Sequence, residues 1–165
     1  MSNDFYMPLV AVMNGYRAIV DTSVRGQYSI VKTYRAEFIR KVRTVVHGIQ
    51  VLLAFGKILI PIRYGLFWLK IVSHKLCRWL VPFFLIAMFI SNLFLFSANP
   101  VYKILLAGQL AVYIVGLMGL ILPASRKLLP VRIAYFFAFV NLSILVAWYK
   151  YLSGEKYVQW EPSKR

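Results

Sequence analysis

The chain has 165 residues, 61% of them apolar, and a formal net charge of +15. Soluble domains are about 45–50% apolar, so this composition excludes an ordinary soluble globular domain. Its single cysteine, Cys77, excludes an intrachain disulfide. The sequence therefore predicts an integral membrane protein that is mainly α-helical.

The first predicted element, residues 1–35, has the pattern of a short α/β segment. An apolar stretch at 5–13 ends at Asn14 and Gly15, a pair typical of turns, and 16–21 has the Ile and Val content of a strand. Such a piece cannot bury a core by itself. We expect its strand edge to pair with another part of a protein or with another chain.

Two amphipathic helices are predicted next, in residues 36–79. The helix at 37–53 has an apolar stripe on one face and mostly basic residues on the other. The helix at 64–79 carries Lys70, His74 and Arg78 one turn apart. Cations at helical spacing are costly inside hydrocarbon. We therefore expect both helices to lie in the membrane plane, with the first helix inserting its apolar stripe at the acyl boundary.

Three transmembrane helices are predicted in residues 80–152, at about 80–97, 104–122 and 133–149. Each stretch lacks charged residues and is long enough to cross about 30 Å of hydrocarbon, the third only just. Small residues let helices approach closely in lipid, so Gly108, Gly116 and Gly119 predict that the second and third helices form an antiparallel pair. A polar tail follows at 153–165.

The positions of the basic residues predict which side of the membrane each segment faces. Twelve of the 20 Lys and Arg residues fall in residues 1–79, and three more fall in the loop 124–132. Both segments are therefore expected on the cytoplasmic side, which places the tail opposite. Because the cations alternate with apolar residues and no nucleic-acid-binding motif is present, we expect contact with membrane lipid and no nucleic-acid partner.

The acidic residues are too few to form a complete active site. The chain has five, at positions 4, 21, 37, 155 and 161, and contains no D-x-D pair, phosphate-binding glycine loop or zinc-ligand spacing. We therefore predict no metal site and no cofactor in this chain.

Five motifs in a fixed order give the sequence a resemblance to the C-terminal part of membrane-bound family 2 glycosyltransferases of the GT-A, polysaccharide-synthase-like type. The motifs are Ser2-Asn3-Asp4-Phe5, Asn14-Gly15-Tyr16-Arg17, Phe38-Ile39-Arg40-Lys41-Val42-Arg43, Pro61-Ile62-Arg63-Tyr64-Gly65 and Ser73-His74-Lys75-Leu76-Cys77-Arg78-Trp79. The resemblance implies that 1–35 is the remnant of a catalytic domain, and that the nucleotide-sugar-binding half, with its Mg or Mn site, is missing.

The resemblance also implies roles for four residues. Asp4 matches the general base that deprotonates the acceptor hydroxyl, which is work that suits a carboxylate. Arg78 and Trp79 match the end of a Q-x-x-R-W motif on the acceptor and diphosphate side, and Lys75 stands where that motif has Gln. The same residues also fit simpler functions, with Asp4 as a helix cap and Arg78 and Trp79 as a boundary cation and aromatic.

The expected function is therefore the membrane-anchoring and acceptor-side portion of a glycosyltransferase in cell-envelope or exopolysaccharide synthesis, in the bacterial inner membrane. The isolated chain is expected to be inactive, and to meet a nucleotide sugar and a glycan acceptor only with the missing half. A small non-enzymatic membrane protein, acting as an assembly or regulatory subunit, explains the composition equally well but not the order of the motifs.

Overall fold

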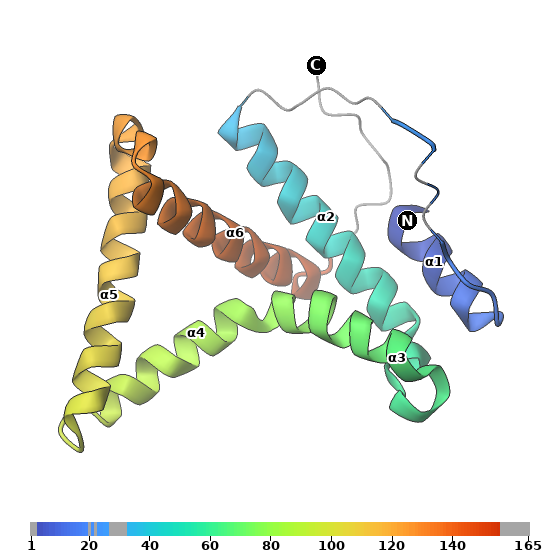
Figure 1. Ribbon diagram of the computed structural model, residues 1–165, viewed down its shortest axis with the longest axis horizontal. Coiled ribbons are helices and arrows are strands. Elements are labelled where there is room, and N and C mark those ends of the chain that lie inside the picture. Colours follow the sequence, from blue (N-terminus) through green and yellow to red (C-terminus); the bar gives the residue numbers. More distant parts are fainter. Residues whose placement is uncertain (1–2, 20, 22, 27–32, 156–165) are drawn as a thin grey trace. The chain divides into compact units, whose positions relative to one another are not determined.

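The computed structural model describes residues 3–19, 21, 23–26 and 33–155 (Figure 1). The chain divides into two compact units: unit 1 comprises residues 1–77 and 146–165, and unit 2 comprises residues 78–145. The helical elements, in chain order, are α1 (Asn3–Met13), α2 (Tyr34–Ala54), η1 (Gly56–Leu59), α3 (Pro61–Ile71), η2 (Val72–Leu76), α4 (Cys77–Phe94), α5 (Pro100–Ile121), η3 (Pro123–Lys127) and α6 (Leu129–Leu152). The predicted tail is described only as far as residue 155.

The described ranges are mainly helical and contain no strand, so the predicted α/β remnant is not supported. Residues 16–19 and 21, where we expected a strand, have irregular backbone. A strand needs a neighbour to accept and donate its backbone hydrogen bonds, and no second strand is present in the described residues to do so. The apolar stretch before it forms α1, which ends where Gly15 adopts a φ of +82°.

Three helices are long and apolar enough to cross a membrane, which agrees with the predicted number of spans. They are Arg63–Phe94, Pro100–Ile121 and Leu129–Leu152. The first differs from the prediction because no break separates 64–79 from the span that follows. It has 32 residues, well beyond the roughly 20 that cross the hydrocarbon as a helix. Part of this helix must therefore lie outside the hydrocarbon. The N-terminal half carries the cations, so we expect that half to be the part outside.

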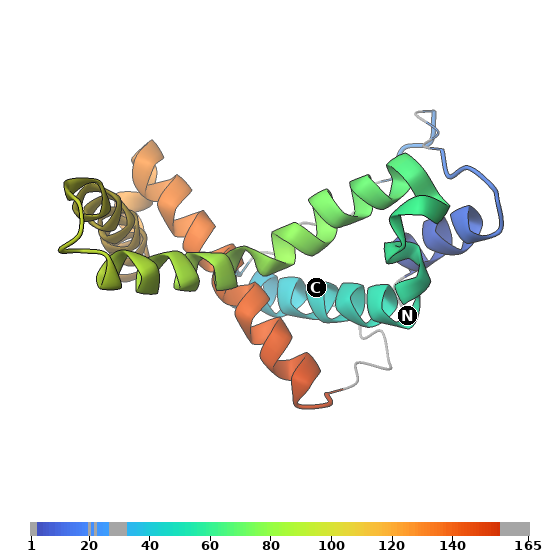
Figure 2. The same ribbon diagram turned by 90° about the horizontal axis from the view of Figure 1, so that it is seen from below.

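In unit 1, α1 lies beside the C-terminal half of α2 and the corner that leads into α3, as two perpendicular views show (Figures 1 and 2). Leu9 of α1 is fully buried, and the rings of Tyr6 and Phe55 lie 5.5 Å apart, centroid to centroid. The corner is closed by the indole Nε1 of Trp68, which donates a hydrogen bond of 2.7 Å to the carbonyl oxygen of Leu59. Gly65, with a φ of +48°, supplies the backbone kink there.

Part of the apolar stripe of α2 packs against protein within unit 1. Val42 and Val46 form a buried cluster with Ala147 in the last turns of α6. The helix begins at Thr33, whose Oγ1 accepts a hydrogen bond from the Ala36 amide. Leu53 of the same stripe is exposed, and the position of α2 in the membrane plane stays a prediction.

In unit 2, α5 and the first part of α6 meet at η3 and move apart from there (Figure 1). A Cβ added to Gly119 would lie 2.8 Å from the Tyr135 Cβ, and one added to Gly116 would lie 3.1 Å from the Ala134 carbonyl oxygen. Those two glycines therefore permit a close approach at the end next to η3, but α5 and α6 do not pack along their length as the predicted antiparallel pair. The third was predicted wrongly, because a Cβ on Gly108 would meet nothing within 4 Å.

Candidate functional site

The four residues singled out by the sequence fall in both compact units. Asp4 is the second residue of α1 and Lys75 lies in η2, both in unit 1, whereas Arg78 and Trp79 lie in the first turn of α4, in unit 2. Asp4 is placed inside the helix and not before it, so its position is that of a first-turn acid. Its side chain lies outside the described part of the structure.

Within unit 1, Lys75 comes close to the motif that contains Asp4. Its Nζ lies 5.0 Å from the centroid of the Phe5 ring, within the range of a cation–π contact. Lys75 is held there by η2, a π-helix between α3 and α4. Such wide turns are rare and occur often at functional sites. The first and last of the five motifs therefore adjoin in this unit.

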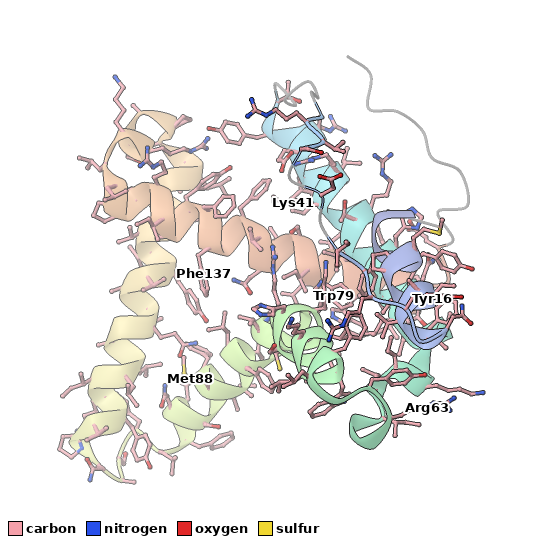
Figure 3. All side chains as sticks on the ribbon, turned by 45° about the vertical axis from the view of Figure 1, so that its right-hand side comes forward. Tyr16, Lys41, Arg63, Trp79, Met88 and Phe137 are labelled. Carbon is pink, nitrogen blue, oxygen red and sulfur yellow. The ribbon has the colours of Figure 1, made fainter. Side chains whose placement is uncertain are left out.

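Trp79 and Arg78 have different environments although they are neighbours in the sequence. The Trp79 side chain, labelled in Figure 3, is only 6% exposed. A buried indole presents no open face for stacking on a sugar. Arg78 is exposed and lines a hollow of unit 2.

That hollow is an apolar groove of about 590 Å³ that the sequence analysis did not identify. Phe137 lines this groove, and its side chain points from α6 toward the space between the helices of unit 2 (Figure 3). Its α4 residues are Arg78 and Val81, and its α6 residues are Arg132, Ile133, Phe136, Phe137, Val140, Asn141 and Ile144. The α6 positions recur at three and four residues, so they form one helix face, a pattern that could have been found in the sequence.

Some polar groups along the groove have hydrogen-bond partners within the described protein, and others do not. Asn141 Nδ2 donates to the Phe137 carbonyl oxygen at 2.8 Å. The Arg78 and Arg132 guanidinium groups have no hydrogen-bond or ion-pair partner among the residues that the structure describes. By contrast, Arg126 Nε donates to the Gly119 carbonyl oxygen at 2.6 Å, and its guanidinium carbon lies 4.1 Å from the centroid of the Tyr135 ring.

The described carboxylates do not gather into a metal site. No group of three or more His, Cys, Asp or Glu side chains able to hold a metal occurs in the described ranges. Glu37 accepts two hydrogen bonds of 2.8 Å from Arg40, which lower the pKa of its carboxyl group. Hydrogen bonds from Ser23 likewise lower the pKa of Asp21. The divalent metal implied by the resemblance therefore has no matching ligand set here.

Compared with known proteins, the chain matches no family model, no curated protein and no solved structure. The resemblance to family 2 glycosyltransferases therefore rests on the order of the five motifs alone.

Proposed function

We propose that this chain is the membrane-anchoring and acceptor-side portion of a glycosyltransferase that takes sugar from a nucleotide-sugar donor in cell-envelope or exopolysaccharide synthesis. It would reside in the bacterial inner membrane with its basic N-terminal region in the cytoplasm, because cytoplasmic segments are enriched in Lys and Arg. Three helices apolar enough to cross a membrane are consistent with this location.

The observation that carries the proposal is the contact of Lys75 with Phe5. It joins the motif that contains Asp4 to the motif that contains Lys75, two segments that are distant in the sequence. An acceptor site of the proposed kind requires this juxtaposition, since the base and the cation act on the two ends of one reaction.

The chemistry assigns each residue a separate task. The acceptor hydroxyl oxygen forms a bond to the sugar C1 while its proton passes to the Asp4 carboxylate. The bond from C1 to the diphosphate oxygen breaks, and the nucleoside diphosphate leaves with the electron pair. Lys75 would offset its negative charge. The donor site must come from another polypeptide segment, because this sequence contains no D-x-D pair.

Joining the chain to the nucleotide-binding half of a family 2 enzyme tests the proposal. Transfer of labelled sugar by the joined protein should fall about 10²–10⁴-fold on Asp4→Asn, as expected for loss of a general base. Asp21→Asn is the matched control, since Asp21 is exposed and bonded only to Ser23 among the described side chains. Equal rates for the two variants would sink the proposed role of Asp4.

The DNA upstream of the Met1 codon distinguishes the proposal from the subunit alternative. A reading frame or frameshifted remnant that encodes an α/β half with a D-x-D pair supports the glycosyltransferase. Unrelated DNA there, together with no transfer by the joined protein, favours a regulatory or assembly subunit.

A further inference from the structure

We propose that the groove between α4 and α6 in unit 2 binds one anionic phospholipid, with its phosphate at Arg78 and Arg132 and an acyl chain along the apolar face of α6. The inference stands on the groove and not on the sugar-transfer proposal. It assigns a ligand to a groove whose α6 wall belongs to none of the five motifs, and Arg78 is the one lining residue that they include.

The wall of the groove suits a hydrocarbon chain. Apart from the two arginines and Asn141, the lining side chains are apolar, and Asn141 satisfies its amide donor within its own helix. The volume of about 590 Å³ lies within the range of about 300–1,000 Å³ that holds small ligands. A chain lying there would cover Phe136, which is 56% exposed, and Ile133, which is 59% exposed.

The two arginines indicate that the ligand carries negative charge. Arg132 and Arg78 both line the groove and have no polar partner in the described part of the chain. Arg126, which is similarly close to α6, is already engaged by the Gly119 carbonyl and the Tyr135 ring. A phosphate accepts the parallel hydrogen bonds that a guanidinium donates, and basic pockets between membrane helices hold anionic headgroups.

Charge also decides between a lipid and a second copy of the chain. The sequence has no Asp or Glu between positions 37 and 155, so the spans of another copy offer no carboxylate to the two arginines. Packing an apolar helix there would leave both guanidinium groups without a counter-charge, which is costly in hydrocarbon. Free phosphate would satisfy the arginines but leave the apolar wall uncovered. An anionic phospholipid satisfies both.

Native mass spectrometry of the full chain, reconstituted in phosphatidylcholine vesicles with a minor fraction of phosphatidylglycerol, tests the inference. We expect one phosphatidylglycerol per chain to survive mild detergent, and retention to fall at least about tenfold in the variant Arg78→Gln/Arg132→Gln, because the variant loses the charge-assisted hydrogen bonds to the phosphate. Lys127→Gln is the matched control, since Lys127 carries the same charge in η3 but does not line the groove.

Two further measurements test the inference even if the double variant fails to fold. Val140→Trp should fill the groove and reduce retention with both arginines intact. Competition on the unaltered protein needs no variant. Added phosphatidylglycerol should exchange with the phosphatidylglycerol bound to the chain, whereas added inorganic phosphate and phosphatidylcholine should not displace it. Equal retention in the double variant at unchanged helix content, or displacement by inorganic phosphate as effective as by the lipid, would overturn the inference.

Discussion

Lys75 lies over the ring of Phe5, with 5.0 Å between its Nζ and the ring centroid, although α1 and η2 are distant in the sequence. Hydrophobic burial holds the rest of α1, since Leu9 is fully buried and Tyr6 packs on Phe55. The contact of Lys75 with Phe5 therefore fixes the position of the first turn of α1. The docking of α1 as a whole depends on its buried residues.

Phe5→Leu should loosen the first turn of α1. The substitution keeps an apolar side chain but removes the aromatic face, a loss of about 0.5–1 kcal/mol for an exposed cation–π contact. We expect amide hydrogen exchange in α1 to quicken by about two- to fivefold while exchange in α2 stays unchanged. Met7→Leu is the control, because Met7 is mostly exposed. Equal exchange in the two variants would show that Lys75 does not hold α1.

Gly119→Ala should destabilise unit 2, and Gly108→Ala should not. The new Cβ at Gly119 would lie 2.8 Å from the Tyr135 Cβ, so helix or side chain must shift, at about 1–3 kcal/mol. At Gly108 nothing lies within 4 Å, and Ala gains about 0.5–1 kcal/mol of helix propensity. Thermal unfolding in detergent should give Tm shifts of opposite sign. A higher Tm for Gly119→Ala contradicts the packing.

Sequence patterns predicted the helices well where the pattern extends over several turns. The span expected at 104–122 is α5, Pro100–Ile121, and its start is fixed by Asn99, whose Oδ1 accepts a hydrogen bond from the Val101 amide. The helix expected at 37–53 is α2, Tyr34–Ala54. Hydrophobic period and capping residues are local properties, so the sequence alone is enough to reveal them.

Features that depend on distant contacts were not predicted. The strand expected at 16–21 had suitable residues but no partner in the described structure. The stripe of α2 was periodic, yet periodicity does not distinguish lipid from protein as the neighbour, and Val42 and Val46 pack on Ala147. The groove was missed because Arg78 and the α6 residues come together only through the fold of unit 2.

The contact of Val42 and Val46 with Ala147 predicts that both ends of the chain lie on one side of the membrane. The sequence placed α2 on the cytoplasmic side and Ala147 near the far end of the third span, and one buried cluster cannot occupy both levels. The four cations at positions 150, 156, 164 and 165 also favour the cytoplasmic side. Ends on one side require an even number of crossings, so we expect two of the three candidate spans to cross.

Cysteine labelling in inside-out and right-side-out vesicles checks this arrangement. In a Cys77→Ser background, Thr33→Cys and Ser153→Cys should react with an impermeant reagent from the same side. Ala98→Cys, between α4 and α5, is the control and should react from the other side. Labelling of Thr33→Cys and Ser153→Cys from opposite sides would show that three helices cross and that the α2–α6 cluster does not form in the membrane.

His47 should make the stability of unit 1 depend on pH. Burial lowers the pKa of this α2 side chain below its ordinary value of 6.5, and repulsion from Arg43 adds to the effect. The unfolded chain therefore binds the proton more readily, so stability is full above about pH 6.5 and falls as the pH drops through the folded pKa. His47→Gln should flatten the Tm profile between about pH 8 and 5. An identical slope in the variant would exclude His47 as its source.

The isolated chain should not bind any nucleotide sugar in a metal-dependent way. A divalent cation between phosphates needs one or two carboxylates free to coordinate it. In the described residues, Asp21 is bonded to Ser23, Glu37 is paired with Arg40 and Lys41, and Glu155 is paired with Lys150 at 2.6 Å. Asp4 alone belongs to a motif associated with sugar transfer.

Calorimetry of the purified chain with a panel of nucleotide sugars, with and without manganese, measures this directly. We expect no heat that depends on manganese, since Asp4 alone supplies too few ligands and the sequence has no D-x-D pair. The same titration on the protein joined to a nucleotide-binding half should show such heat, and Asp4→Asn should leave it unchanged because a general base acts on the acceptor and not on the donor. Tight manganese-dependent binding by the isolated chain would mean that the donor site lies within these 165 residues.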